Sequence, residues 1–150
     1  MPDPTPTSKT AGKVEDAASA IEKRLQGLKP AIGIILGTGL GGLSKEIRGR
    51  IPIPYAEIPH FVTSTVDGHA GELVAGDLGG RPVVTMEGRF HFYAGYSMEQ
   101  VTLPVRVMRR LGCQTLVVSN ASGAMNPQFR AGDLVLIEDH INLTWQNPLV

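Results

Sequence analysis

The sequence has few of the features that direct a protein to a particular compartment. Its 150 residues include one cysteine, Cys113, which lies in a polar stretch between Gly112 and Gln114, so an internal disulfide is excluded and a reducing environment fits. No run of about 18 apolar residues occurs, and the opening MPDPTPTSKTAGK has no apolar segment of the kind that a signal peptide needs. These absences predict a cytoplasmic protein.

An excess of charge of either sign is also lacking. The 14 Lys and Arg residues balance 14 Asp and Glu residues, so the formal net charge is zero. A general affinity for nucleic acid or for an anionic membrane is therefore not expected, and any anion must be bound locally. The length suits one domain with a single core, preceded by a disordered leader over residues 1–12.

Several signatures of catalytic and metal sites are missing as well. The glycine-rich loops carry no carboxylate pair of the glycosidase type, no Gly-Lys-Ser/Thr follows a glycine-rich loop, and Ser122 lacks the G-x-S-x-G context of a hydrolase nucleophile. No cysteine pair and no H-x-x-x-H spacing supports a metal site. We therefore predict no metal, although the sequence has four histidines: His60, His69, His91 and His140.

Hydrophobic spacing predicts alternating helices and strands. Apolar residues recur at helical spacing over residues 14–28, and Pro30 ends that run. Ser97 and Gln100 form a capping-box pattern for a helix that continues to Leu111, with a kink expected at Pro104. A short helix is predicted over 43–47, and strands are predicted over 32–36, 72–78, 81–86, 115–119 and 134–137.

The spacing of two of these strands predicts a β-hairpin. Residues 72–78 and 81–86 are separated only by Gly79-Gly80, a dipeptide that tolerates the positive φ angles of a tight hairpin turn. A hairpin makes one strand pair antiparallel, whereas strands that alternate with helices pair in parallel. The predicted fold is therefore α/β, with a mixed central sheet flanked by helices.

The loop GTGLGG (37–42) follows the first predicted strand and matches the pattern G-x-G-x-x-G. Glycines in such a loop let backbone N–H groups approach an anion closely. A tight turn without a ligand has the same pattern. A dinucleotide-binding domain is a further interpretation, but it needs an acidic residue about 20 positions on, and the nearest one, Glu57, lies in the proline-rich IPIPYAEIPH.

Arg89 and His91 lie in the unusual segment MEGRFHFYAGY (86–96). Two residues apart in an extended segment, their side chains point to the same side and can hold one anion together. The predicted strand ends carry a set of side chains that suits an oxyanion such as phosphate, none of them acidic: Thr38, His69, Arg89, His91 and Asn120. The neighbouring aromatics, Phe90, Phe92, Tyr93 and Tyr96, offer an apolar wall and supply part of the core.

Five blocks of the sequence occur together in a pattern that is more specific than any single motif. The blocks are ILGTGLGGL (35–43), EIPHF (57–61), STVDGHAGELV (64–74), EGRFHFYAGYSMEQVTLPVRVM (87–108) and LVVSNASGAMNPQFRAGDLVLIEDHINL (116–143). Together they resemble the trimeric class of purine nucleoside phosphorylases. They cover nearly the whole chain after the leader, so residues 13–150 are interpreted as the N-terminal part of one phosphorylase-like α/β domain that is truncated relative to the family.

The resemblance implies an activity and a set of site residues. The implied reaction is phosphorolysis of inosine- or guanosine-type nucleosides to the free base and (deoxy)ribose 1-phosphate, with no metal or organic cofactor and with a homotrimer as the assembly. His91 is the implied catalytic residue. The implied phosphate site consists of Thr38, His69, Arg89, Phe90, His91, Asn120 and Ala121, and the implied nucleoside contacts are Tyr93, Ala121, Ser122 and Gly123.

Three departures from the family pattern bear on this implied activity. Ala94 stands where the family usually has a glutamate that orients the histidine, and Ala124 stands where it usually has a glycine. The family also continues beyond residue 150 with the residues that bind the purine ring. A phosphate- or nucleotide-binding protein without catalysis is therefore the alternative to the enzyme.

Overall fold

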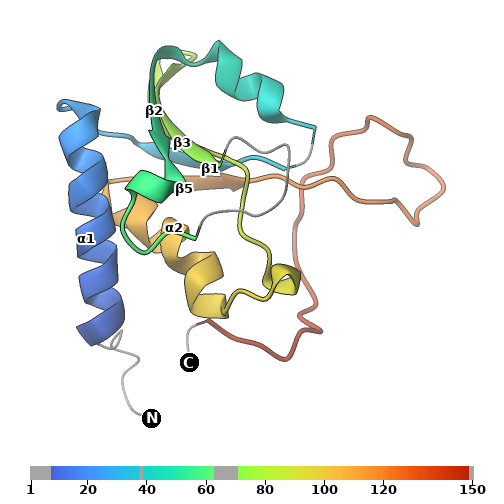
Figure 1. The fold of residues 1–150 in the computed structure, drawn as a ribbon. Coiled ribbons are helices and arrows are strands. Elements are labelled where there is room, and N and C mark those ends of the chain that lie inside the picture. Colours follow the sequence, from blue (N-terminus) through green and yellow to red (C-terminus); the bar gives the residue numbers. More distant parts are fainter. Residues whose placement is uncertain (1–7, 38, 63–70, 149–150) are drawn as a thin grey trace.

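The computed structural model describes residues 8–37, 39–62 and 71–148. Figure 1 shows two long helices packed beside a twisted sheet, followed by an extended C-terminal segment. The helices are α1 (Ser8–Leu25) and α2 (Met98–Arg110), and the strands are β1 (Ile32–Ile35), β2 (Arg48–Pro54), β3 (Glu72–Leu78), β4 (Arg81–Glu87) and β5 (Thr115–Val118). Three short 3-10 helices are η1 (Gly41–Glu46), η2 (Tyr55–Glu57) and η3 (Phe92–Ala94).

The five strands form one mixed sheet in the order β2-β3-β4-β1-β5. Strand β1 pairs in parallel with both β4 and β5, whereas β2, β3 and β4 pair antiparallel. The predicted hairpin is confirmed: Leu78 pairs with Arg81, and Gly79 and Gly80 have φ angles of 62° and 82°. Because both turn residues need positive φ, glycine at these positions fixes the register of the whole hairpin.

Strand β2 was not predicted from the sequence. Its proline-rich end, Ile51–Pro54, has a pattern that argues against a central strand, because proline cannot donate a backbone hydrogen bond. Among the described residues β2 lies at the sheet edge and pairs with β3 alone. On its outer side no neighbouring strand needs the N–H groups that its prolines lack. Ile53 still reaches the core, with 1% of its surface exposed.

The strand predicted over residues 134–137 is wrong. In the structure this segment has no regular secondary structure, and Leu134 and Leu136 are 96% and 94% exposed. An apolar run becomes a strand only when a neighbouring strand takes up its backbone N–H and C=O groups. Figure 1 shows the chain after β5 running away from the sheet and returning near α2, where Arg106 donates a 3.0 Å hydrogen bond to the carbonyl of Pro148.

Helices α1 and α2 cover one face of the sheet and bury its main core. This core joins Ala17, Ile21 and Leu25 of α1 to Leu103, Val107 and Met108 of α2 and to strand residues such as Leu73 and Met86. The α/β class and the mixed sheet are confirmed, with both long helices on the same face. No helix in the described part of the chain is long and apolar enough to cross a membrane.

Helix α1 has different bounds from those predicted. It begins at Ser8, so residues 8–12, which we assigned to the leader, are helical; the remaining leader residues lie outside the described part of the chain. It ends at Leu25 instead of continuing to residue 28. The cause is local, because Gln26 and Gly27 have φ angles of 51° and 92°, a left-handed backbone that ends a helix.

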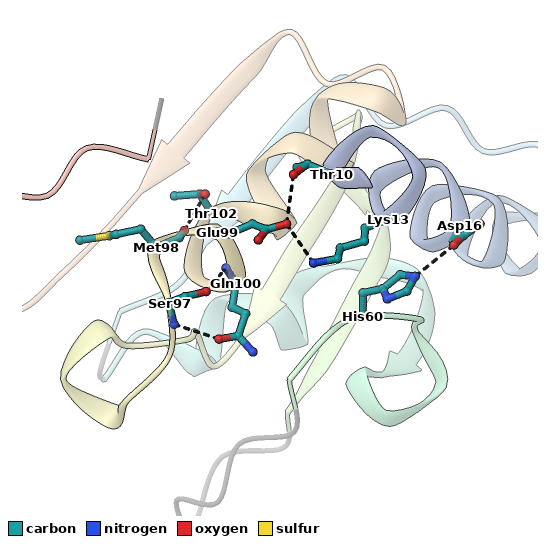
Figure 2. Close-up of polar contacts among 9 residues, drawn as sticks. All are labelled: Thr10, Lys13, Asp16, His60, Ser97, Met98, Glu99, Gln100 and Thr102. Carbon is teal, nitrogen blue, oxygen red and sulfur yellow. Dashed lines mark hydrogen bonds and ion pairs between the residues drawn. The ribbon is translucent and has the colours of Figure 1, made fainter. Parts of the chain in front are cut away.

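Exposed polar contacts join α1 to α2 and to the segment after η2 (Figure 2). Glu99 of α2 accepts hydrogen bonds from Lys13 at 3.0 Å and Thr10 at 3.1 Å, and His60 contacts Asp16 at 3.0 Å. The Lys13 bond is the main cause that lowers the pKa of Glu99. Exposed pairs of this kind are worth about 0–1 kcal/mol each, so they contribute little to the stability of the fold beside the buried core between α1 and α2.

The start of α2 is set by side-chain hydrogen bonds at its first turn. The predicted capping box is present: Ser97 Oγ accepts from the Gln100 backbone at 3.2 Å, and Gln100 Oε1 accepts from the Ser97 backbone at 2.9 Å (Figure 2).

Beyond the helix, Cys113 is buried against the core rather than lying in a polar setting. Burial raises the pKa of its thiol to about 11, so the thiol is neutral at physiological pH.

We predict opposite stability effects for two alanine substitutions in and beside α1. A Cβ at Gly12 or at Gly27 meets nothing within 4 Å, but Gly27 has φ +92° and Gly12 lies inside the helix. Gly12→Ala should therefore raise the free energy of unfolding by about 0.5–1 kcal/mol, and Gly27→Ala should lower it by about 1 kcal/mol. Urea denaturation measures both, and equal signs for the two variants would contradict this reading of the α1 terminus.

Candidate functional site

Three loops meet at the carboxyl edge of the parallel part of the sheet. Strands β4, β1 and β5 run in the same direction side by side, so the residues that follow them emerge at one edge. These residues are Gly37 after β1, Arg89 after β4 and Ser119 after β5. In open α/β sheets this edge is the usual place for a ligand.

Ser119 connects the three loops through its hydroxyl and its backbone. Its Oγ accepts a 2.9 Å hydrogen bond from the backbone N–H of Gly37 and donates to the carbonyl of Ile35 at 3.3 Å. Its own carbonyl accepts a 2.7 Å hydrogen bond from Nη1 of Arg89. One residue therefore fixes the end of β1 and the direction of the Arg89 guanidinium.

The approach of the first loop to the third is close enough to require glycine. A Cβ built at Gly37 would lie 2.6 Å from the carbonyl oxygen of Ser119 and 2.8 Å from the Cα of Asn120. Both neighbours are backbone atoms, which cannot rotate away as a side chain can. The first glycine of GTGLGG is therefore a packing requirement between two loops of the site.

A buried aromatic cluster holds the base of the Arg89 loop. Phe90 is 5% exposed, and its ring lies 5.3 to 6.1 Å from the rings of Tyr55, Phe61 and Tyr96. Tyr55 donates a 2.7 Å hydrogen bond to the carbonyl of Gly88, and burial raises the pKa of its phenol. Because the Phe90 side chain lies in the core, any phosphate contact by this residue must come from its backbone.

His91 and Tyr93 extend outward from that base. Their rings are stacked, with centroids 4.6 Å apart and planes 22° from parallel, and Tyr93 is 83% exposed. A turn holds the segment: Ala94 donates its backbone N–H to the His91 carbonyl at 3.0 Å, and Gly95 has φ 89°. An exposed phenol stacked on an imidazole offers a flat surface and a hydroxyl to a bound sugar.

The structure brings together only part of the predicted site. Arg89 and the segment that begins at Asn120 lie at the same sheet edge, and His91 and Tyr93 lie on one turn. Thr38 and His69 are outside the described residues. Ala121, Ser122 and Gly123 follow β5 as an exposed segment. Within the described ranges no three His, Cys, Asp or Glu side chains are grouped so that they could hold a metal ion.

Sequence reasoning missed a charged cluster at the base of the Arg89 loop. Glu72 and Glu87 are directly opposite each other on β3 and β4, and Nη2 of Arg50 lies 3.4 Å and 3.0 Å from their carboxylates. The pKa of Glu72 is raised by burial and by Glu87, against the opposing effect of Arg50. The register of the predicted Gly79-Gly80 hairpin already places 72 opposite 87, so this carboxylate pair could have been found.

Comparison with known proteins agrees with this architecture. The family model described as "Phosphorylase superfamily" matches residues 31–150. The chain belongs to the phosphorylase superfamily. Among curated members of the superfamily, purine nucleoside phosphorylase 1 of Bacillus subtilis is 54% identical over 138 residues, which cover 92% of this chain and 51% of the relative. Purine nucleoside phosphorylase of Rattus norvegicus is 54% identical over 124 residues, which cover 81% of this chain and 43% of the relative.

Solved superfamily structures match the fold as well as the sequence. A crystal structure of purine nucleoside phosphorylase in complex with ribose-1-phosphate has a TM-score of 0.76 at 48% identity, covering 81% of this chain and 44% of that one. The Schistosoma mansoni enzyme in complex with inosine has a TM-score of 0.75 at 46% identity, covering 81% and 42%. The predicted resemblance is confirmed, and the chain spans about half the length of these superfamily relatives.

We predict that Gly37→Ala disturbs the site of this superfamily member whereas Gly41→Ala does not disturb the fold. A Cβ at Gly37 overlaps backbone atoms of the β5 loop, and a Cβ at Gly41 meets nothing within 4 Å. Overpacking of this kind costs about 1–3 kcal/mol, so Gly37→Ala should lower the free energy of unfolding by that amount, with less than about 0.5 kcal/mol for Gly41→Ala. Chemical denaturation measures both, and equal effects would refute the close approach.

Proposed function

We propose that the chain carries the phosphate-binding and ribose-binding part of a purine nucleoside phosphorylase. In the proposed reaction an oxygen of inorganic phosphate attacks the anomeric carbon of an inosine- or guanosine-type nucleoside. The bond from that carbon to the purine breaks, and the products are the free base and (deoxy)ribose 1-phosphate. The observation that carries the proposal is the convergence of Gly37, Arg89 and Ser119 at one sheet edge.

The chemistry of this edge suits a bound dianion. Arg89 supplies a permanent positive charge with several N–H donors, and its described hydrogen bond is to a carbonyl that carries no formal charge. A phosphate held there is positioned for in-line attack, and its negative charge stabilises a sugar with oxocarbenium character. The proposed remaining contacts are Thr38 and His69, the backbone of Phe90, and the backbone of Asn120 and Ala121.

The sugar and base would lie beyond this phosphate. We assign Tyr93 to the ribose, because its exposed ring stacks on His91 next to the Arg89 loop. We assign the catalytic role to His91 and the wall of the nucleoside pocket to the exposed segment of Ala121, Ser122 and Gly123. The ligands of the solved relatives support a sugar phosphate and a nucleoside as the occupants of this site, because one relative holds ribose-1-phosphate and another holds inosine.

A second candidate function is phosphate or nucleotide binding without catalysis. One observation favours it: Ala94 offers no carboxylate next to His91. Both candidate functions include binding of phosphate at the same site. Only the phosphorylase also turns over a nucleoside. Assembly as a homotrimer, a cytoplasmic location and independence from metal and organic cofactors stay predictions.

We predict that Arg89→Ala weakens phosphate binding and abolishes phosphate-dependent release of hypoxanthine from inosine. Loss of one charge-assisted hydrogen bond should weaken phosphate binding by roughly 10- to 100-fold. Titration calorimetry with inorganic phosphate and a chromatographic assay of hypoxanthine measure the two effects. Arg81→Ala is the matched control, because Arg81 is exposed at the opposite end of β4.

The results separate the candidate functions. Hypoxanthine release that needs phosphate and is lost in Arg89→Ala supports the phosphorylase. Saturable phosphate binding without any hypoxanthine release supports the binding protein. Release that is independent of phosphate, or that Arg89→Ala leaves unchanged, would overturn the proposed phosphorylase.

We predict that Ala94→Glu raises turnover of inosine. Position 94 follows the His91–Tyr93 stack in the same turn and is exposed, so a longer side chain has room beside the imidazole. A carboxylate that orients His91 should raise kcat by up to about 10-fold, the effect of one added hydrogen bond. Ala94→Gln is the control of equal size without charge, and an equal gain in both variants would show that the negative charge has no part.

A further inference from the structure

We propose that Ser119 is the positioning residue of the phosphate site: its hydroxyl and carbonyl set the distance between the β1 loop and the Arg89 guanidinium. This inference rests on the proposed function, because it assigns a role within the same phosphate site. Ser119 lies between β5 and the predicted phosphate contact Asn120, and it was not among the predicted site residues.

The hydroxyl of Ser119 determines where the β1 loop ends. It accepts from the backbone N–H of Gly37 at 2.9 Å and donates to the carbonyl of Ile35 at 3.3 Å, while the Ser119 backbone N–H donates to that same carbonyl at 3.0 Å. The N–H of Gly37 is thereby directed toward β5. The hydroxyl of Ser119 therefore fixes Gly37, the residue that ends the described part of the chain after β1.

The carbonyl of Ser119 determines where the guanidinium points. Nη1 of Arg89 donates to it at 2.7 Å, a short bond for a charged donor. Among the described residues, Arg89 forms no ion pair with a carboxylate within 4.0 Å, so a neutral acceptor orients its charge without cancelling it. This bond also fixes the orientation of the other N–H donors of the planar Arg89 guanidinium relative to the β5 loop.

The two roles of Ser119 are linked by rigid backbone. The Cα of Asn120 and the carbonyl oxygen of Ser119 lie so close to Gly37 that no Cβ fits between the two loops. A shift of Ser119 therefore moves the β1 loop and the guanidinium together. A phosphate bound by both needs them at a fixed separation, because misplacement of a binding group by about 1 Å is costly.

The test is titration of inorganic phosphate into the chain and its Ser119 variants by calorimetry. Ser119→Ala removes both hydrogen bonds of the hydroxyl and keeps the carbonyl, whereas Ser119→Thr keeps the hydroxyl. We expect about 5- to 10-fold weaker phosphate binding for Ser119→Ala and binding within about two-fold of the parent for Ser119→Thr. Thr102→Ala is the matched control, because Thr102 donates its hydroxyl to the Met98 carbonyl inside α2 at 2.8 Å and should leave phosphate binding unchanged.

A thermal melt of each variant separates positioning from folding. Ser119→Cys, of nearly the same volume but with a weak hydrogen-bonding group, replaces Ser119→Ala if that variant does not fold. Loss of phosphate affinity in a folded Ser119→Ala or Ser119→Cys, with rescue by Ser119→Thr, supports the proposal. Unchanged affinity in the folded variants, or equal loss in Ser119→Thr, overturns it. No saturable phosphate binding by the parent chain would overturn the proposed function itself.

Discussion

The parallel pairing of β1 with both β4 and β5 is the constraint on which the rest of the structure depends. It places a four-residue strand, Ile32–Ile35, between two neighbours that run in its own direction. Each parallel neighbour needs a crossover that returns the chain to the same end of the sheet. Helix α2 supplies the crossover from β4 to β5, and its buried face closes the core together with α1.

The same pairing explains why the site has its composition. Three parallel strands end at one edge of the sheet, so the three loops that follow them lie close together. Where the backbones of two loops touch, only small residues fit. Gly37 and Ser119 meet this need, and Arg89 reaches across the narrow gap to the Ser119 carbonyl. Aromatic packing around Phe90 and the Tyr55 bond to Gly88 keep the Arg89 loop from relaxing away.

Elements governed by neighbouring residues were predictable from the sequence. The Gly79-Gly80 turn and the Ser97–Gln100 capping box depend on a few adjacent positions, and both are present. Elements governed by distant partners were not. Strand β2 was missed because its prolines are acceptable only at an edge, and residues 134–137 were assigned to a strand although no described strand pairs with them.

The candidate site, too, could be predicted only where it depends on neighbouring residues. The sequence identified the loops, because glycines and polar residues follow apolar runs. It did not identify the bond from Arg89 to Ser119, which joins residues 30 positions apart through a side-chain conformation. The cluster of Glu72, Glu87 and Arg50 could be predicted in part. The hairpin register places Glu72 opposite Glu87, but the position of Arg50 depends on the pairing of β2 with β3.

Strand β5 differs from the other strands at this edge in how well it is protected. Among the described strands it pairs with β1 alone, and each of its four residues is exposed. Ser119 follows β5 directly, so its position depends on the pairing of β5 with β1. Opening of β5 alone would break every bond that Ser119 makes. The bonds of Ser119 to Gly37, Ile35 and Arg89 therefore form and break together with the pairing of β5 to β1.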